Sequence, residues 1–99
     1  MKVIVKEPGR AAYEAEVENN LEDLQEAVGG YIQAVPLMTD FVIICDEEGR
    51  LKGKLYNCEI CGVSFVGTIL ICGQDNDEFA DAPVPLKTLK PLMPQLGGE

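Results

Sequence analysis

Apolar residues in this 99-residue chain are grouped into short runs that are separated by turn-forming residues. Two such runs, residues 31–35 and 41–45, follow each other closely, and each is bounded by glycine, proline or aspartate. This pattern is typical of adjacent β-strands. Residues 41–45 have no polar alternation, which predicts a central strand buried on both faces. Residues 63–72 form a second strongly apolar run and the second candidate for the centre of the same sheet.

The beginning of the chain predicts one strand and leaves the next element open. Residues 2–6 place three aliphatic residues between lysines, which indicates a short strand, and residues 7–9 form a turn sequence of glutamate, proline and glycine. Residues 12–17 alternate between apolar residues and glutamates, which fits a returning strand. Glutamate and alanine are poor strand formers, however, so a helix over residues 11–18 remains an alternative.

Residues 21–28 carry the one clear helical pattern. The apolar residues recur at the spacing of a single helix face: Leu21, Leu24 and Val28. Asn19 and Asn20 offer an N-cap, and one of Gly29 and Gly30 is expected to end the helix in the left-handed conformation. We therefore predict one main helix.

The remaining segments predict turns, loops and a tail. Residues 46–49 indicate a turn, residues 50–56 a mixed strand or loop, and residues 73–82 an acidic loop. Prolines then become frequent, at Pro83, Pro85, Pro91 and Pro94. They leave room for one helical turn over residues 86–90.

These elements predict an α+β fold. We expect a mostly antiparallel twisted sheet with the main helix packed on one face. Residues 1–82 would form a single domain, and residues 83–99 a proline-rich tail that packs on the domain or trails from it.

The charge balance limits the partners that this chain can take. Its 17 acidic and 8 basic residues give a formal net charge of −9. Such a charge repels nucleic-acid phosphates, so we expect no direct nucleic-acid binding. The charge either keeps the protein soluble or attracts a basic partner, and in the second case it could also imitate the charge of DNA.

The apolar segments predict a cytoplasmic protein. The first residues lack the long apolar stretch of a signal peptide. The longest apolar region is too short to span a bilayer, so no membrane partner is expected. Cysteines of a cytoplasmic protein are reduced thiols by default.

Cys58 and Cys61 form a Cys-x2-Cys sequence that resembles the first half of a zinc finger. The second half is absent, because the chain has no histidine and no second Cys-x2-Cys. The other two cysteines, Cys45 and Cys72, end apolar runs, where a thiol behaves as a small hydrophobic side chain. We therefore predict no metal or cofactor, with zinc at Cys58 and Cys61 as the alternative.

No pattern in the chain predicts catalysis. The absence of histidine removes the usual general base at neutral pH. Gly29 and Gly30 end a predicted helix, whereas a phosphate-binding loop needs glycines that open one. We predict that the protein is not an enzyme.

Four stretches carry a resemblance to a known family. They are Gly-Gly-Tyr-Ile-Gln-Ala-Val-Pro-Leu at 29–37, Ile-Ile-Cys-Asp-Glu-Glu-Gly-Arg-Leu-Lys-Gly at 43–53, Asn57, and Val-Gly-Thr-Ile-Leu-Ile-Cys-Gly at 66–73. The chain resembles, over about residues 1–82, a family of small uncharacterised proteins of gut Firmicutes, their phages and conjugative elements, known as a domain of unknown function. The resemblance implies a fold and a genomic setting, and no reaction.

Glu47, Glu48 and Asn57 match that family pattern and are polar. They are our candidates for a binding surface, and the alternative is that they are turn residues that hold a hairpin. The functional hypothesis is a non-enzymatic acidic accessory protein of a mobile genetic element, which binds or inhibits a host protein through its acidic surface or a sheet edge. A small-ligand or zinc-binding module at Cys58 and Cys61 is the alternative.

Overall fold

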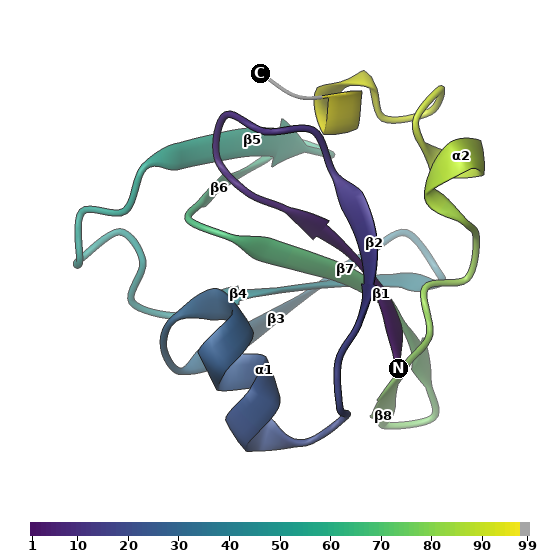
Figure 1. Cartoon of the computed structure of the whole chain (residues 1–99), viewed down its shortest axis with the longest axis horizontal. Coiled ribbons are helices and arrows are strands. Elements are labelled where there is room, and N and C mark those ends of the chain that lie inside the picture. The colour runs from purple at the N-terminus through teal and green to yellow at the C-terminus, as the bar shows by residue number, and fades with distance from the viewer. Residues whose placement is uncertain (98–99) are drawn as a thin grey trace.

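The computed structural model describes residues 1–97 and contains two sheets. The main sheet is antiparallel throughout and has the order β2-β1-β7-β4-β3, with β8 paired to β7, while β5 and β6 form a separate hairpin (Figure 1). The strands are β1 (Lys2–Lys6), β2 (Tyr13–Glu16), β3 (Ile32–Leu37), β4 (Phe41–Asp46), β5 (Tyr56–Ile60), β6 (Val63–Val66), β7 (Ile69–Asp75) and β8 (Glu78–Ala80). The helices are α1 (Leu21–Val28), α2 (Leu86–Leu89) and the 3-10 helix η1 (Pro94–Gly97). The predicted α+β fold, a mostly antiparallel sheet with one main helix, is confirmed.

The predicted adjacent strands at residues 31–35 and 41–45 are also confirmed. β3 pairs with β4 over six residues, and β4 lies between β3 and β7 in the middle of the sheet. β3 extends beyond the predicted end and includes Pro36, which is paired with Val42. Proline is tolerated there because β3 is the last strand of the sheet and its outer side needs no donor.

The apolar run over residues 63–72 is two strands, and the prediction of one segment there is wrong. The chain turns at Gly67, which has a φ of 71° and donates its N–H to the carbonyl of Leu55. β6 therefore joins the hairpin with β5, and β7 enters the centre of the main sheet. Both strands are buried on at least one face and are therefore apolar, so the sequence shows no change in polarity where one strand ends and the next begins.

Two other segments differ from the prediction or resolve it. Residues 73–82 are a hairpin of β7 and β8, and the prediction of a loop is wrong. Asn76 turns the chain with a φ of 57°, a conformation that asparagine tolerates better than most residues. The open choice over residues 11–18 is settled by β2, which pairs with β1 as a strand.

α1 begins and ends where its sequence predicts. Asn20 Oδ1 accepts a hydrogen bond of 2.8 Å from the N–H of Asp23, and Gly29 adopts a left-handed φ of 81°. Leu24 and Val28 are buried, whereas Leu21 is 58% exposed, so the predicted apolar stripe is one residue shorter. Among residues 1–97, no helix has both the length and the apolar character to cross a membrane.

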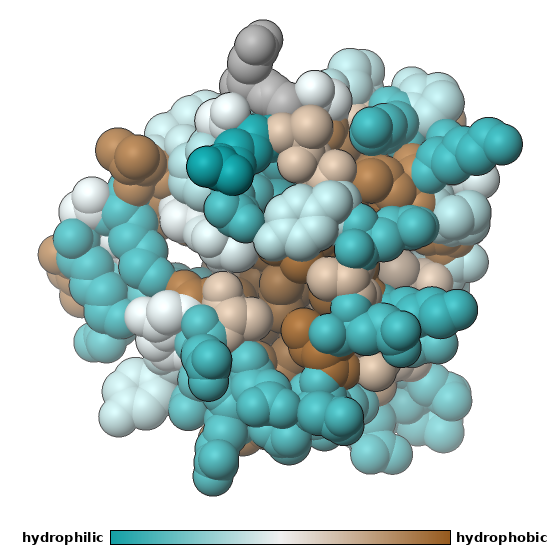
Figure 2. All heavy atoms as spheres, in the orientation of Figure 1, coloured by the Kyte–Doolittle hydropathy of each residue, from teal (hydrophilic) through white to brown (hydrophobic). Residues whose placement is uncertain are grey.

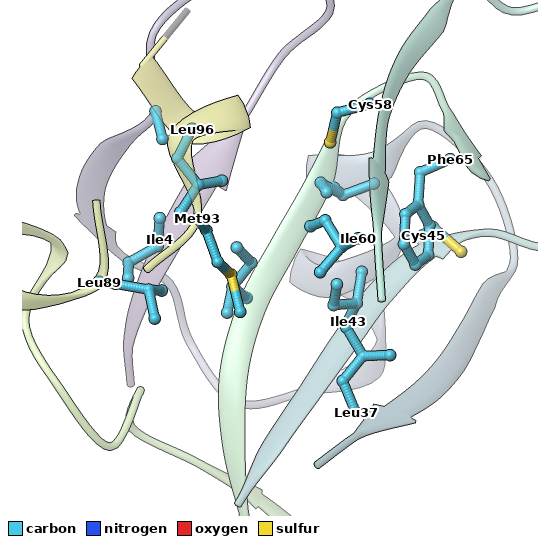
Figure 3. Close-up of a cluster of buried hydrophobic side chains, with 13 residues drawn as sticks. Ile4, Leu37, Ile43, Cys45, Cys58, Ile60, Phe65, Leu89, Met93 and Leu96 are labelled. Atoms are coloured by element: carbon cyan, nitrogen blue, oxygen red, sulfur yellow. The ribbon is translucent and has the colours of Figure 1, made fainter. Parts of the chain in front are cut away.

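Buried apolar side chains form two clusters, one on each face of the main sheet. We call the first the helix-side core: Val3, Val5, Leu24, Val28, Val42, Ile44, Leu70 and Cys72. The second, the hairpin-side core, combines the opposite face of the sheet with the β5–β6 hairpin and the tail (Figure 3): Ile4, Ala12, Leu37, Ile43, Cys45, Cys58, Ile60, Phe65, Ile69, Ile71, Leu89, Met93 and Leu96. Alternation along β1, β4 and β7 sends successive residues to opposite faces, so the buried apolar residues of these strands are divided between the two cores.

The proline-rich tail contributes three of its side chains to the hairpin-side core. Leu89, Met93 and Leu96 are all at most 5% exposed. The predicted helical turn is α2, and its first N–H, at Leu86, donates to Glu14 Oε2 of β2 at 2.9 Å. Residues 98–99 of the predicted tail lie outside the described residues.

Candidate functional site

The three residues predicted as a binding surface do not lie together on one. Glu47 and Glu48 are exposed in the turn after β4, but Asn57 is only 5% exposed. Asn57 Nδ2 donates to two backbone carbonyls, those of Lys6 at 2.8 Å and Gly67 at 2.7 Å. Its side chain thus ties β5 to the end of β1 and to the turn before β7. Asn57 Oδ1 is buried and has no hydrogen-bond partner within residues 1–97.

A buried ion cluster lies at the end of β4, where the sequence predicts only a turn. The Asp46 side chain is 1% exposed, and its Oδ2 lies 2.9 Å from Lys52 Nζ and 2.7 Å from Lys54 Nζ. Asp46 Oδ1 accepts a 2.8 Å hydrogen bond from the N–H of Glu48. Burial by itself raises the pKa of Asp46, but the hydrogen bonds from Lys54 and Lys52 outweigh it and lower this pKa to about 2.

The same lysines bind the end of α1. Lys54 Nζ donates to the carbonyl of Val28 at 2.7 Å, and Lys52 Nζ donates to that of Gly29 at 3.1 Å. α1 has no basic residue in its own last turn, so these loop lysines supply the positive charge that a helix C-terminus favours. One cluster therefore joins β4, α1 and the loop between β4 and β5.

Glycines allow this cluster to pack closely. A Cβ atom on Gly30 would lie 2.6 Å from Asp46 Oδ1, and one on Gly67 would lie 2.7 Å from Lys54 Cδ. The segments that carry the family resemblance thus converge on Asp46 from separate parts of the chain. Three sequence features together could have predicted the cluster. They are an aspartate at the end of a buried strand, a Lys-x-Lys sequence in the loop after that strand, and paired glycines at the end of the preceding helix.

The four cysteines occupy different environments. Cys61 and Gly62 have φ values of 51° and 79° and form the two-residue turn between β5 and β6. Cys61 is exposed, whereas Cys58 points into the hairpin-side core (Figure 3), where burial raises the pKa of its thiol. Cys45 and Cys72 belong to the two opposite cores. Within residues 1–97, no three His, Cys, Asp or Glu side chains are placed to hold a metal ion.

Carboxylates from β2, the following turn and α1 line a groove of about 460 Å³ between these elements. We call this the acidic face: Glu16, Glu18, Asp23 and Glu26. The two ion pairs in the described part of the chain both use Asp46, so none of these four carboxylates has a lysine or arginine counter-ion there. Met1, Val17 and Ala27 complete the lining of the groove, and the ammonium group of Met1 donates a hydrogen bond to the carbonyl of Val17.

Sequence comparison now places the chain in a family. Residues 1–90 match the family described as Domain of unknown function (DUF3846). The chain belongs to this family. No significant match was found among curated proteins or among solved structures.

The DUF3846 match includes both features described above and extends past the predicted boundary at residue 82 to cover α2. In this DUF3846 chain, the charge of Asp46 is compensated by two lysines of the chain, and the cluster is hydrogen-bonded to the backbone of Val28, Gly29 and Glu48. Its geometry serves the fold. The acidic face is the opposite case, because within residues 1–97 none of its carboxylates forms an ion pair with a lysine or arginine.

Proposed function

We propose that this chain is a non-enzymatic accessory protein that binds a basic protein partner through its acidic face. The observation that carries the proposal is that few positive charges are available to balance the surface carboxylates. Lys52 and Lys54 both pair with Asp46, and Lys6 is fully buried. The positive charges of the chain are thus partly withdrawn from the surface, which makes the surface field more negative than the net charge suggests. Such a field attracts cationic partners and speeds their association.

The non-enzymatic part of the proposal is supported by the chemistry of the side chains. The sequence has no histidine. Asp46 has a lowered pKa, but its carboxylate is already paired with two lysines. Burial raises the pKa of Cys72 to about 12, which leaves that thiol unreactive. The mobile-element setting and a host protein as the partner derive from the sequence resemblance, and a cytoplasmic location accords with four free thiols.

Affinity capture with two charge-matched variants tests the proposal. In the first variant, the acidic face is neutralised by Glu16→Gln, Glu18→Gln, Asp23→Asn and Glu26→Gln. In the control, an equal charge is removed from exposed positions elsewhere: Glu47→Gln, Glu48→Gln, Asp75→Asn and Asp77→Asn.

We expect wild type and the control to retain a partner from host lysate at low salt and to release it at high salt. We expect the first variant to retain none. If all three proteins capture the same partner, or if none captures any, the acidic face is not the binding surface.

A further inference from the structure

The outer edge of β2 presents unpaired backbone groups. Met1 and Val17 exchange two hydrogen bonds, from Met1 N to Val17 O at 2.9 Å and from Val17 N to Met1 O at 3.0 Å. Along two antiparallel strands, residue pairs that exchange backbone hydrogen bonds alternate with pairs that do not. The register pairs Lys2 with Glu16 and Ile4 with Glu14, so these are the non-bonded pairs. The N–H and C=O groups of Glu14 and Glu16 therefore point away from β1.

The C-terminal segment covers this edge only at its start. The backbone N–H of Ala12 points away from β1, like those of Glu14 and Glu16. It donates to the carbonyl of Leu96 at 2.9 Å. Beyond that bond the edge is open, with a groove on either side. The acidic face lies on one side, and on the other a groove of about 660 Å³ separates β1 and β2 from residues 81–85. Figures 1 and 2 look onto this edge, where an apolar strip is bordered by hydrophilic residues.

The strand at the opposite end of the order β2-β1-β7-β4-β3 has a blocked edge, which favours β2 over β3 as the site of strand addition. The N–H of Glu47 donates to Tyr31 O, so the alternation along β3 directs Ile32, Ala34 and Pro36 outward. Proline has no N–H, and an outward-facing proline is a common way to prevent further strands from joining a sheet. β2 carries no such residue between Tyr13 and Glu16.

We propose that an extended basic peptide adds to the sheet as an antiparallel strand along β2, with lysine or arginine opposite Glu14 and Glu16. This proposal rests on the proposed function and specifies its partner. Opposite charges directly across an antiparallel pair attract, whereas a second copy of β2 would place glutamate against glutamate and be repelled. The charge of the edge thus selects a basic strand and disfavours self-association.

A synthetic peptide tests the strand arrangement. The probe is acetyl-Thr-Lys-Thr-Lys-Thr-Lys-Thr-amide, because threonine favours strands and keeps the peptide soluble. In antiparallel pairing, the lysines opposite the glutamates direct their own N–H groups toward β2, and the threonines direct theirs away. N-methylation of the lysines should weaken binding at least about tenfold, since it removes these hydrogen bonds and adds a steric block. N-methylation of the threonines should leave affinity within about twofold, since it removes no bond to β2.

Binding is followed by NMR of the 15N-labelled chain, in which the amide protons of Glu14 and Glu16 should move downfield. Glu16→Lys should weaken binding about fivefold, in the range of exposed charge pairs. The matched control is Glu59→Lys, on β5, which should leave binding unchanged. Glu14 is not substituted, because its carboxylate also holds the start of α2.

The outcomes separate the two proposals. Equal effects of the two methylated peptides, or a larger effect of threonine methylation, would overturn the antiparallel strand and leave the acidic face as a binding surface. Absence of peptide binding, together with charge-dependent capture of a protein partner, would also overturn the strand alone. Absence of both would overturn the strand and the proposed function together.

Discussion

Lys54 Nζ lies 2.7 Å from Asp46 Oδ2 and also 2.7 Å from the carbonyl oxygen of Val28. A single ammonium group therefore joins the end of β4 to the end of α1. Asp46 is nearly inaccessible to water, so its charge depends on the lysines that reach it. The loop between β4 and β5 is attached to the body of the protein by this contact and by Lys52.

Removing the charge of Asp46 should destabilise the fold. We expect Asp46→Asn to lower the free energy of unfolding by about 3 kcal/mol, because it leaves two lysines without their shared partner. Lys54→Met should cost less, since Lys52 continues to pair with Asp46. Chemical denaturation measures both. Glu47→Gln, at the exposed neighbouring position, is the control and should change stability by less than about 0.5 kcal/mol.

The same carboxylate predicts an acid sensitivity. The pKa of Asp46 falls from 3.8 to about 2 on folding, so its contribution to stability is present above pH 4 and is lost as the pH falls toward 2. The loss amounts to roughly 2 kcal/mol at about 1.4 kcal/mol for each pKa unit. We expect the stability difference between wild type and Asp46→Asn to shrink over this interval. A difference that stays constant from pH 6 to pH 2 would contradict the lowered pKa.

Asn57 should behave as a structural residue. Asn57→Ala leaves the buried carbonyls of Lys6 and Gly67 without their donor, and we expect it to lower the free energy of unfolding by about 2–3 kcal/mol. Asn19→Ala is the control, because Asn19 Nδ2 also donates to a backbone carbonyl, that of Phe79, but at an exposed site. It should cost less than about 1 kcal/mol. A stable Asn57→Ala protein would restore the interpretation of Asn57 as a binding residue.

The thiols should differ sharply in reactivity. Cys61 is exposed, and the other three cysteines are buried with raised pKa values. We expect iodoacetamide at pH 8 to modify Cys61 alone in the folded protein and all four cysteines in denaturant, as read by mass spectrometry. Added zinc should not protect Cys61. Slower alkylation in the presence of zinc would revive the metal-binding alternative.

Local patterns predicted the main sheet and its helix because both are defined by short-range signals. The apolar runs that became β3 and β4 lie next to each other in sequence, and Asn20 and Gly29 mark the ends of α1. The break at Gly67 escaped prediction because the residues on both sides are apolar. The β7–β8 hairpin escaped because its charges suggested a loop, although an edge hairpin can carry charges toward solvent.

The site residues were harder to predict than the strands. Asn57 is polar, which suggested the surface, yet its partners Lys6 and Gly67 come from other elements and are brought to it only by the fold. The sequence predicts a turn at Asp46, because the lysines reach its carboxylate only after the following loop folds back. The backbone groups of β2 that remain unpaired are determined by the hydrogen-bond register between β2 and β1. The sequence of β2 alone does not specify this register.

The position of Leu89, Met93 and Leu96 has a consequence for biosynthesis. These side chains close the hairpin-side core that contains Ile4 of β1, the first of the described strands to be translated. The core around Ile4 therefore lacks three of its buried side chains until almost the whole described sequence has been translated. A ribosome that stalls before residue 89 would therefore hold a sheet with one apolar face incompletely covered, which is a natural target for chaperones and proteases.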